Sequence, residues 1–104
     1  MIAKYRNTKT GGYDSKKESK RAQALRLLER AGEVSHLEEQ VTFELIPKQE
    51  GERAVKYIAD FVYHIPGGHT VVEDVKSPIT RKNPDYIIKR KLMKFIHGIT
   101  VLET

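Results

Sequence analysis

The chain of 104 residues contains no cysteine. This absence excludes disulfides, thiolate zinc sites and cysteine nucleophiles, and it makes a reducing cytosol, and hence a cytoplasmic location, the simplest expectation. The chain also lacks any apolar run that approaches the roughly 18 residues needed to span a bilayer, so we expect no membrane partner. Its first residues, MIAKYRNTKTGGY, contain no apolar core of the kind found in secretory signals.

Charge is plentiful and unevenly distributed. Charged residues make up 32% of the chain and apolar residues 38%, which suits one small domain with a modest core. The formal net charge is +5, but residues 31–75 are acidic, whereas residues 1–30 and 76–97 are strongly basic. Two basic segments around an acidic middle favour a polyanion held over a carboxylate cluster, although solvated helix faces would give the same counts.

The pattern of elements predicts an α/β domain. Residues 1–14 are basic, contain Gly11-Gly12 and show no periodicity, so we expect a flexible basic arm followed by a single domain over 15–104. Ser15 and Glu18 form an S-x-x-E capping box at the start of a helix over 15–31, which Gly32 ends. The polar stretch GEVSHLEEQ is expected to connect this helix to the first strand.

Period-two alternation predicts strands over 40–46, 54–65 and 69–76, and the turn Pro66-Gly67-Gly68 joins the last two as a hairpin. Pro84 marks the start of a helix over 84–97, Gly98 its end, and 99–103 a last short strand. The order is α-β-β-β-α-β, with a mixed central sheet flanked by helices. The expected apolar stripes are Ala24, Leu25, Leu28 and Ala31 on the first helix, and Ile88, Leu92, Phe95 and Ile96 on the second.

Carboxylates interrupt two of these apolar strands. Asp60 lies within IADFV, and Asp74 and Lys76 share one face of VVEDVK because alternate side chains of a strand point the same way. A hairpin centred near residue 67 places Asp60 opposite residue 74. Two such carboxylates repel each other, and a divalent cation is the usual remedy.

Glu18 is a third candidate, since it lies on the edge of the first helix's apolar side, one turn before Ala22. Oxygen donors without cysteine or paired histidines favour Mg²⁺ or Mn²⁺. We therefore predict a metal site at Asp60, Asp74 and Glu18, with the Val75 carbonyl as a further ligand. Lys76 would lie beside the metal-bound water, where its positive charge could lower the pKa of that water or stabilise the charge that develops on a phosphate. Such a site has the groups that phosphodiester hydrolysis requires.

These residues carry a resemblance to a known superfamily. Asp-(13 residues)-Asp-x-Lys on adjacent strands, preceded by a helical Glu, resembles the PD-(D/E)XK nucleases, whose common core has the same element order. The stretches DSKKE, QVTFELIP, YIADFVY and VVEDVKS, with the Lys-rich last helix, are similar to a small phage and prophage family of unknown function. The resemblance implies a restriction-endonuclease-like fold, metal carboxylates at Asp60 and Asp74, a catalytic Lys76 and a helical acidic residue at Glu18. Ala59 stands where the superfamily motif has proline.

A phage nuclease implies DNA as the partner, with branched or junction intermediates among its substrates, action in the host cytoplasm, and a homodimer, since such an enzyme cuts two strands. The predicted backbone contacts are Lys16, Lys17, Lys20, Arg81, Lys82, Lys89 and Lys91.

Several alternatives stay open at this point. Glu18 could serve only as a helix cap, Asp60 could form a structural ion pair with Lys76, and Asp74 with Lys76 could face solvent. A register slip would exchange Glu73 for Asp74. The whole domain could also be a non-catalytic nucleic-acid-binding module or a protein–protein adaptor.

Overall fold

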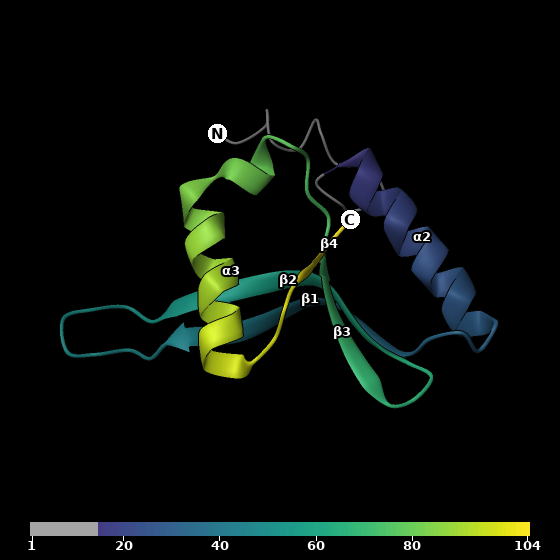
Figure 1. The fold of residues 1–104 in the computed structure, drawn as a ribbon, viewed down its shortest axis with the longest axis horizontal. Coiled ribbons are helices and arrows are strands. Elements are labelled where there is room, and N and C mark those ends of the chain that lie inside the picture. The colour runs from purple at the N-terminus through teal and green to yellow at the C-terminus, as the bar shows by residue number, and fades with distance from the viewer. Residues whose placement is uncertain (1–14) are drawn as a thin grey trace.

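The computed structural model describes residues 15–104, which form two helices, a short 3₁₀ helix and one mixed four-stranded sheet (Figure 1). The predicted α-β-β-β-α-β order and mixed α/β class are confirmed. The predicted arm over 1–14 lies outside the described residues. Within residues 15–104, neither helix combines the length and apolar character needed to cross a membrane. The elements are α2 (Lys16–Arg30), β1 (Ser35–Ile46), β2 (Val55–Ile65), β3 (His69–Asp74), η1 (Thr80–Lys82), α3 (Pro84–His97) and β4 (Leu102–Glu103).

The sheet order is β1-β2-β3-β4, antiparallel except for the β3–β4 pair. Gly67 and Gly68, with φ of 98° and 85°, form the turn between β2 and β3, where a side chain would be strained. The hairpin pairs Phe61 with Glu73 and Ile65 with His69, and this register carries Asp60 toward Asp74. The predicted hairpin register is therefore correct, and the one-residue slip is excluded.

Strand β1 is longer than predicted. It begins at Ser35 rather than residue 40, so the stretch assigned to a connection is strand. The misassignment has a physical cause: His36 and Gln40 adopt left-handed φ of 55° and 54°, and the register with β2 shifts between Ser35 and Glu38. Such irregularities break the period-two alternation on which the prediction depended.

Helix α2 packs on the sheet through a small apolar cluster. The Ser15 side chain accepts a hydrogen bond from the Glu18 backbone N–H, as the capping box predicts. Ala22 and Leu25 are buried against Phe61 and Tyr63. The predicted stripe is only partly correct: Leu25 is buried, whereas Leu28 and Ala31 are exposed, because the inward side of the helix runs through Glu18, Ser19 and Ala22.

Helix α3 has the predicted bounds but buries a different side. Asn83 caps its start through the N–H groups of Asp85 and Tyr86, and Gly98 ends it with a left-handed φ of 69°. Tyr86 and Met93 are buried in the second apolar cluster, with Tyr57, Ala59 and Val72 of the sheet. Of the predicted stripe, only Leu92 packs on this cluster, while Ile88, Phe95 and Ile96 are exposed. Both sets have helical spacing, so spacing alone does not decide between them.

Strand β4 lies beside β3 and is shorter than predicted. It pairs Leu102 with Glu73 and Glu103 with Asp74. The Thr104 N–H donates to the Asp74 carbonyl, and the Thr104 carbonyl accepts from the Lys76 N–H. β3 ends at Asp74, two residues before the predicted end, but these hydrogen bonds keep Lys76 in register with the sheet. In Figure 1, β4 runs between the two helices, which stand apart on either side of it.

Glu73 is fully buried and links three elements. Arg21 on α2 binds both carboxylate oxygens, with nitrogen–oxygen distances of 2.5 and 2.9 Å. The hydroxyls of Tyr63 and Thr104 donate to the same carboxylate, at 2.6 and 3.1 Å. Burial alone would raise the pKa of Glu73, but these donors outweigh it and hold that pKa below the ordinary 4.5. Glu73 thereby fixes α2 on the sheet.

Replacing Arg21 by methionine tests this link. In Arg21→Met, the buried Glu73 carboxylate loses its counter-charge, and we expect the free energy of unfolding at pH 7 to fall by about 3 kcal/mol. Burial would then raise the Glu73 pKa, so the variant should regain stability toward pH 4, where the carboxyl protonates. The wild type should instead lose stability as the pH falls, because its Glu73 pKa is lowered. Urea denaturation at both pH values measures these differences.

The matched control is Arg26→Met on the same helix. Arg26 binds Glu39 at 2.8 Å on the surface, so this change should cost less than about 1 kcal/mol. Equal losses in the two variants would contradict the role given to Glu73.

Candidate active site

Asp60 and Asp74 meet at the end of the β2–β3 hairpin. Asp60 Oδ2 accepts a hydrogen bond from the Val75 N–H at 2.8 Å, which fixes one carboxylate on the backbone beside the other. Burial, together with the neighbouring Asp60 carboxylate, which favours a protonated Asp74 that can donate to it, raises the pKa of Asp74 to about 7. Asp74 therefore takes up a proton more readily than an ordinary aspartate, as expected of a buried carboxyl beside a second acid.

Lys76 and Tyr57 contact Asp74 from two sides. The Lys76 ammonium lies 3.3 Å from Asp74 Oδ2, and the Tyr57 hydroxyl donates to the same oxygen at 2.5 Å. Lys76 also lies over the Tyr86 ring, 4.4 Å from its centre, a cation–π contact that limits where the ammonium can go. Lys76 therefore pairs with Asp74, rather than with Asp60 as one alternative held. Asp74 is buried, which excludes the solvent-facing alternative.

Glu18 reaches the carboxylate pair through Gln40. Glu18 is buried, and its Oε2 accepts a hydrogen bond from Gln40 Nε2 at 3.1 Å. The same nitrogen lies 3.4 Å from Asp60 Oδ1. The Glu18 side chain thus faces the site while its backbone N–H takes part in the cap. The Gln40 amide therefore links Glu18 to Asp60. The Gln40 backbone is held in the left-handed conformation.

The donors at this site are oxygens, which Mg²⁺ and Mn²⁺ prefer in proteins. Asp60 and Asp74 already lie together at the cost of a raised pKa, and a cation would relieve their repulsion, so these two residues fit a divalent ion. Within residues 15–104, no group of three or more histidine or acidic side chains is arranged to hold a metal. Glu18 is joined to the pair by Gln40 rather than placed directly on it.

A hollow of about 380 Å³ opens beside Asp74 and Lys76. Its lining includes two more ammonium groups, those of Lys56 on β2 and Lys89 on α3. Its three lysines outnumber its two carboxylates, those of Asp74 and Asp85, so the hollow can accept a phosphate group close to the acidic pair. Lys56 is not among the predicted contacts, although alternation along β2 places residues 56, 58 and 60 on one face.

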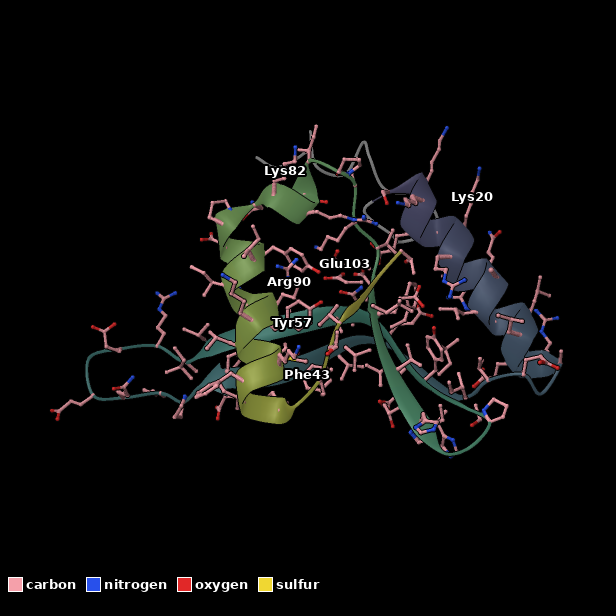
Figure 2. All side chains as sticks on the ribbon, in the orientation of Figure 1. Lys20, Phe43, Tyr57, Lys82, Arg90 and Glu103 are labelled. Atoms are coloured by element: carbon pink, nitrogen blue, oxygen red, sulfur yellow. The ribbon has the colours of Figure 1, made fainter. Side chains whose placement is uncertain are left out.

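The other predicted phosphate contacts divide into separate groups. The Lys17 ammonium donates to the Lys76 carbonyl at 2.9 Å, so this residue contacts the site backbone directly. Figure 2 shows Lys20 on α2 and Lys82 on η1 extending outward, and Arg81 of η1 lies 3.7 Å from Glu103. Lys16 is exposed on α2. Lys91 does not line this hollow but a different one, on another side of α3.

Gln40 offers a test of strain at this site. A non-glycine residue in the left-handed region costs about 1 kcal/mol, and such strain often accompanies functional sites. We expect Gln40→Gly to be more stable than Gln40→Ala by about 1 kcal/mol, the reverse of the usual order in a strand, because both remove the amide but only glycine relieves the strain. Thermal unfolding of the two variants measures the difference, and the usual order would contradict the assignment.

Replacing Asp74 by asparagine tests the carboxylate pair, with a chelator present to remove metal ions. Since the pKa of Asp74 is raised, its contribution to folding is present below about pH 4 and is lost as the pH rises toward 7. Asp74→Asn keeps an acceptor for Tyr57 and removes the buried charge. It should stabilise the protein by on the order of 2 kcal/mol at pH 8 and change little at pH 4. Urea denaturation at both pH values tests this, and a loss of stability at pH 8 would contradict the pairing.

Comparison with known proteins gives a family without an assigned activity. A family model described as a protein of unknown function, DUF1064, matches residues 2–98. No curated protein and no solved structure matches the chain. Since the matched range covers the capped helix, the β2–β3 hairpin with both aspartates, and α3, the chain belongs to the DUF1064 family.

Proposed function

We propose that this protein is a metal-dependent endonuclease that hydrolyses phosphodiester bonds of DNA. The observation that carries the proposal is the convergence of Asp60, Asp74 and Lys76: the Asp60 carboxylate is bound to the N–H of Val75, the residue after Asp74, and the Lys76 ammonium lies 3.3 Å from Asp74. The resemblance of these residues to the PD-(D/E)XK nucleases supports the same reading.

Asp60 and Asp74 would hold Mg²⁺ or Mn²⁺, with the Val75 carbonyl and Glu18 as the further predicted ligands. When bound, such an ion polarises a phosphoryl oxygen and makes water a better nucleophile at neutral pH. Binding also requires Asp74 to lose its proton, because a carboxylate that holds a metal must be ionised.

Lys76 supplies a fixed positive charge beside the acidic pair. Its ammonium is restrained by Asp74 on one side and by the Tyr86 ring on the other. A charge held in place in this way can stabilise the negative charge that develops on a phosphate without first reorganising. Lys56 and Lys89 extend the positive charge over the adjoining hollow, where the phosphate enters.

The remaining cations would hold the DNA backbone. Lys16, Lys17 and Lys20 on α2, and Arg81 and Lys82 before α3, carry charge that contacts phosphates without reading the sequence. Branched or junction DNA in phage recombination or replication is the substrate we propose, with a homodimer to cut two strands and the host cytoplasm as the place of action.

Cleavage assays with site variants test the proposal. Linear, branched and single-stranded DNA are incubated with Mn²⁺, with Mg²⁺ or with chelator. We expect cleavage that needs the metal, and Asp74→Asn and Lys76→Met should lower its rate by on the order of 10³-fold. DNA binding by gel shift in chelator should change less than threefold in Asp74→Asn.

Lys48→Met is the matched control for Lys76→Met. Lys48 is an exposed lysine in the turn before β2, far along the strand from Asp60, and its loss should leave the rate unchanged. If no substrate is cut with either metal while DNA binding persists, the protein is a nucleic-acid-binding module and not a nuclease. An RNA substrate in the same assay decides between the two nucleic acids.

A further inference from the structure

Helix α3 presents an apolar stripe to solvent. The exposed fractions are 56% for Ile88 and 86% for Phe95, two residues seven positions apart and therefore on one side of the helix. These residues were expected in the core, and Tyr86 and Met93 take that place instead. An exposed aromatic side chain of this kind, bordered by polar groups, is typical of a binding surface.

A hollow of about 510 Å³ lies along this stripe, between α3 and the segment that leads into β4. Phe95 and the buried Val101 give it apolar walls. Its other side chains are Arg90, Lys91, Lys94 and Thr100, so three cations border an apolar hollow. The volume falls in the range of sites that enclose a side chain or small ligand.

The cations of this hollow differ in how they are held. Arg90 is fixed, since its guanidinium donates to Glu103 at 3.2 Å, and Figure 2 shows it directed from α3 toward β4. Lys91 and Lys94 form no ion pair within residues 15–104, so their charges are available to a ligand.

The hollow faces away from the carboxylate pair. Lys89 borders the hollow that contains Asp74, and Lys91 follows two residues later, roughly 200° further around the helix. A phosphate held beside Asp74 therefore lies on a different side of α3 from Phe95 and Lys94. The second hollow is a separate surface rather than an extension of the first.

The side chains define the chemistry of the occupant. The ammonium groups of Lys91 and Lys94 favour an acidic ligand. Phe95 and Val101 favour an apolar side chain, and a sugar–phosphate backbone has no such group to place between them. A second copy of the same face is disfavoured, because it would bring cation against cation. We propose that this hollow, called here the α3 groove, binds an acidic segment of a partner protein that inserts one large apolar side chain between Phe95 and Val101.

Fluorescence anisotropy with a labelled peptide tests the proposal on the whole protein. The probe is six aspartates followed by leucine and phenylalanine, and the comparison peptide ends in glycine and serine instead. We expect saturable binding of the first peptide at micromolar concentration, at least tenfold tighter than the second. Phe95→Ser and Lys94→Glu should each weaken it at least tenfold.

Lys48→Glu is the matched control, since it makes the same charge change at an exposed turn. Circular dichroism should show all variants folded, because Phe95 and Lys94 are exposed. Asp74→Asn should bind the peptide as the wild type does, so this result does not depend on the nuclease proposal.

Four outcomes would overturn the α3 groove as a peptide site. The first is equal binding of the two peptides, and the second is an equal loss in Lys48→Glu and Lys94→Glu. The third is the finding that Phe95→Ser weakens binding of single-stranded DNA while leaving the peptide unaffected, which would assign Phe95 to base stacking instead. Self-association lost in Phe95→Ser, without peptide binding, would assign the groove to a second copy.

Discussion

The pairing of β2 with β3 holds two carboxylates together against their own repulsion. The register of the hairpin, fixed by the Gly67-Gly68 turn, places the side chains of Asp60 and Asp74 side by side. The cost is visible in the raised pKa of Asp74. A protein selected for stability alone has no reason to keep this arrangement, and this is the strongest sign that the site has a function.

Glu73, the residue before Asp74, lies in surroundings of the opposite kind. Glu73 is as buried as Asp74, but it receives Arg21, Tyr63 and Thr104 and its pKa is lowered. The two adjacent carboxylates of β3 therefore lie in opposite electrostatic surroundings: Glu73 faces a guanidinium and fixes α2 on the sheet, whereas Asp74 lies beside a second acid. Helix α2 also carries Glu18. By fixing α2 on the sheet, Glu73 therefore positions a residue that faces the Asp60–Asp74 pair.

Much of this could be predicted from the sequence, and the exceptions have physical causes. Alternation and the Pro-Gly-Gly turn were enough to place Asp60 opposite Asp74, because both are local signals. The backbone of Gln40 was not predictable, since a left-handed residue inside a strand interrupts the alternation and resembles the end of the strand. The prediction of which side of α3 is buried was wrong, because Ile88 and Phe95 have the same spacing as Tyr86 and Met93. The Tyr86 hydroxyl, which donates to Glu103 at 2.6 Å, favours the observed face, and that contact spans two elements.

The parallel pairing of β3 with β4 has a consequence for how the domain assembles. The β1–β2 and β2–β3 hairpins join neighbours in sequence, but the hydrogen bonds that fix the backbone of Asp74 and Lys76 come from Thr104, beyond the whole of α3. Contacts between such distant segments carry a larger entropic cost of loop closure than those of the hairpins. A chain with both hairpins formed but β4 undocked would lack the hydrogen bonds that hold Lys76 beside Asp74, so the candidate site is complete only when β4 has joined the sheet.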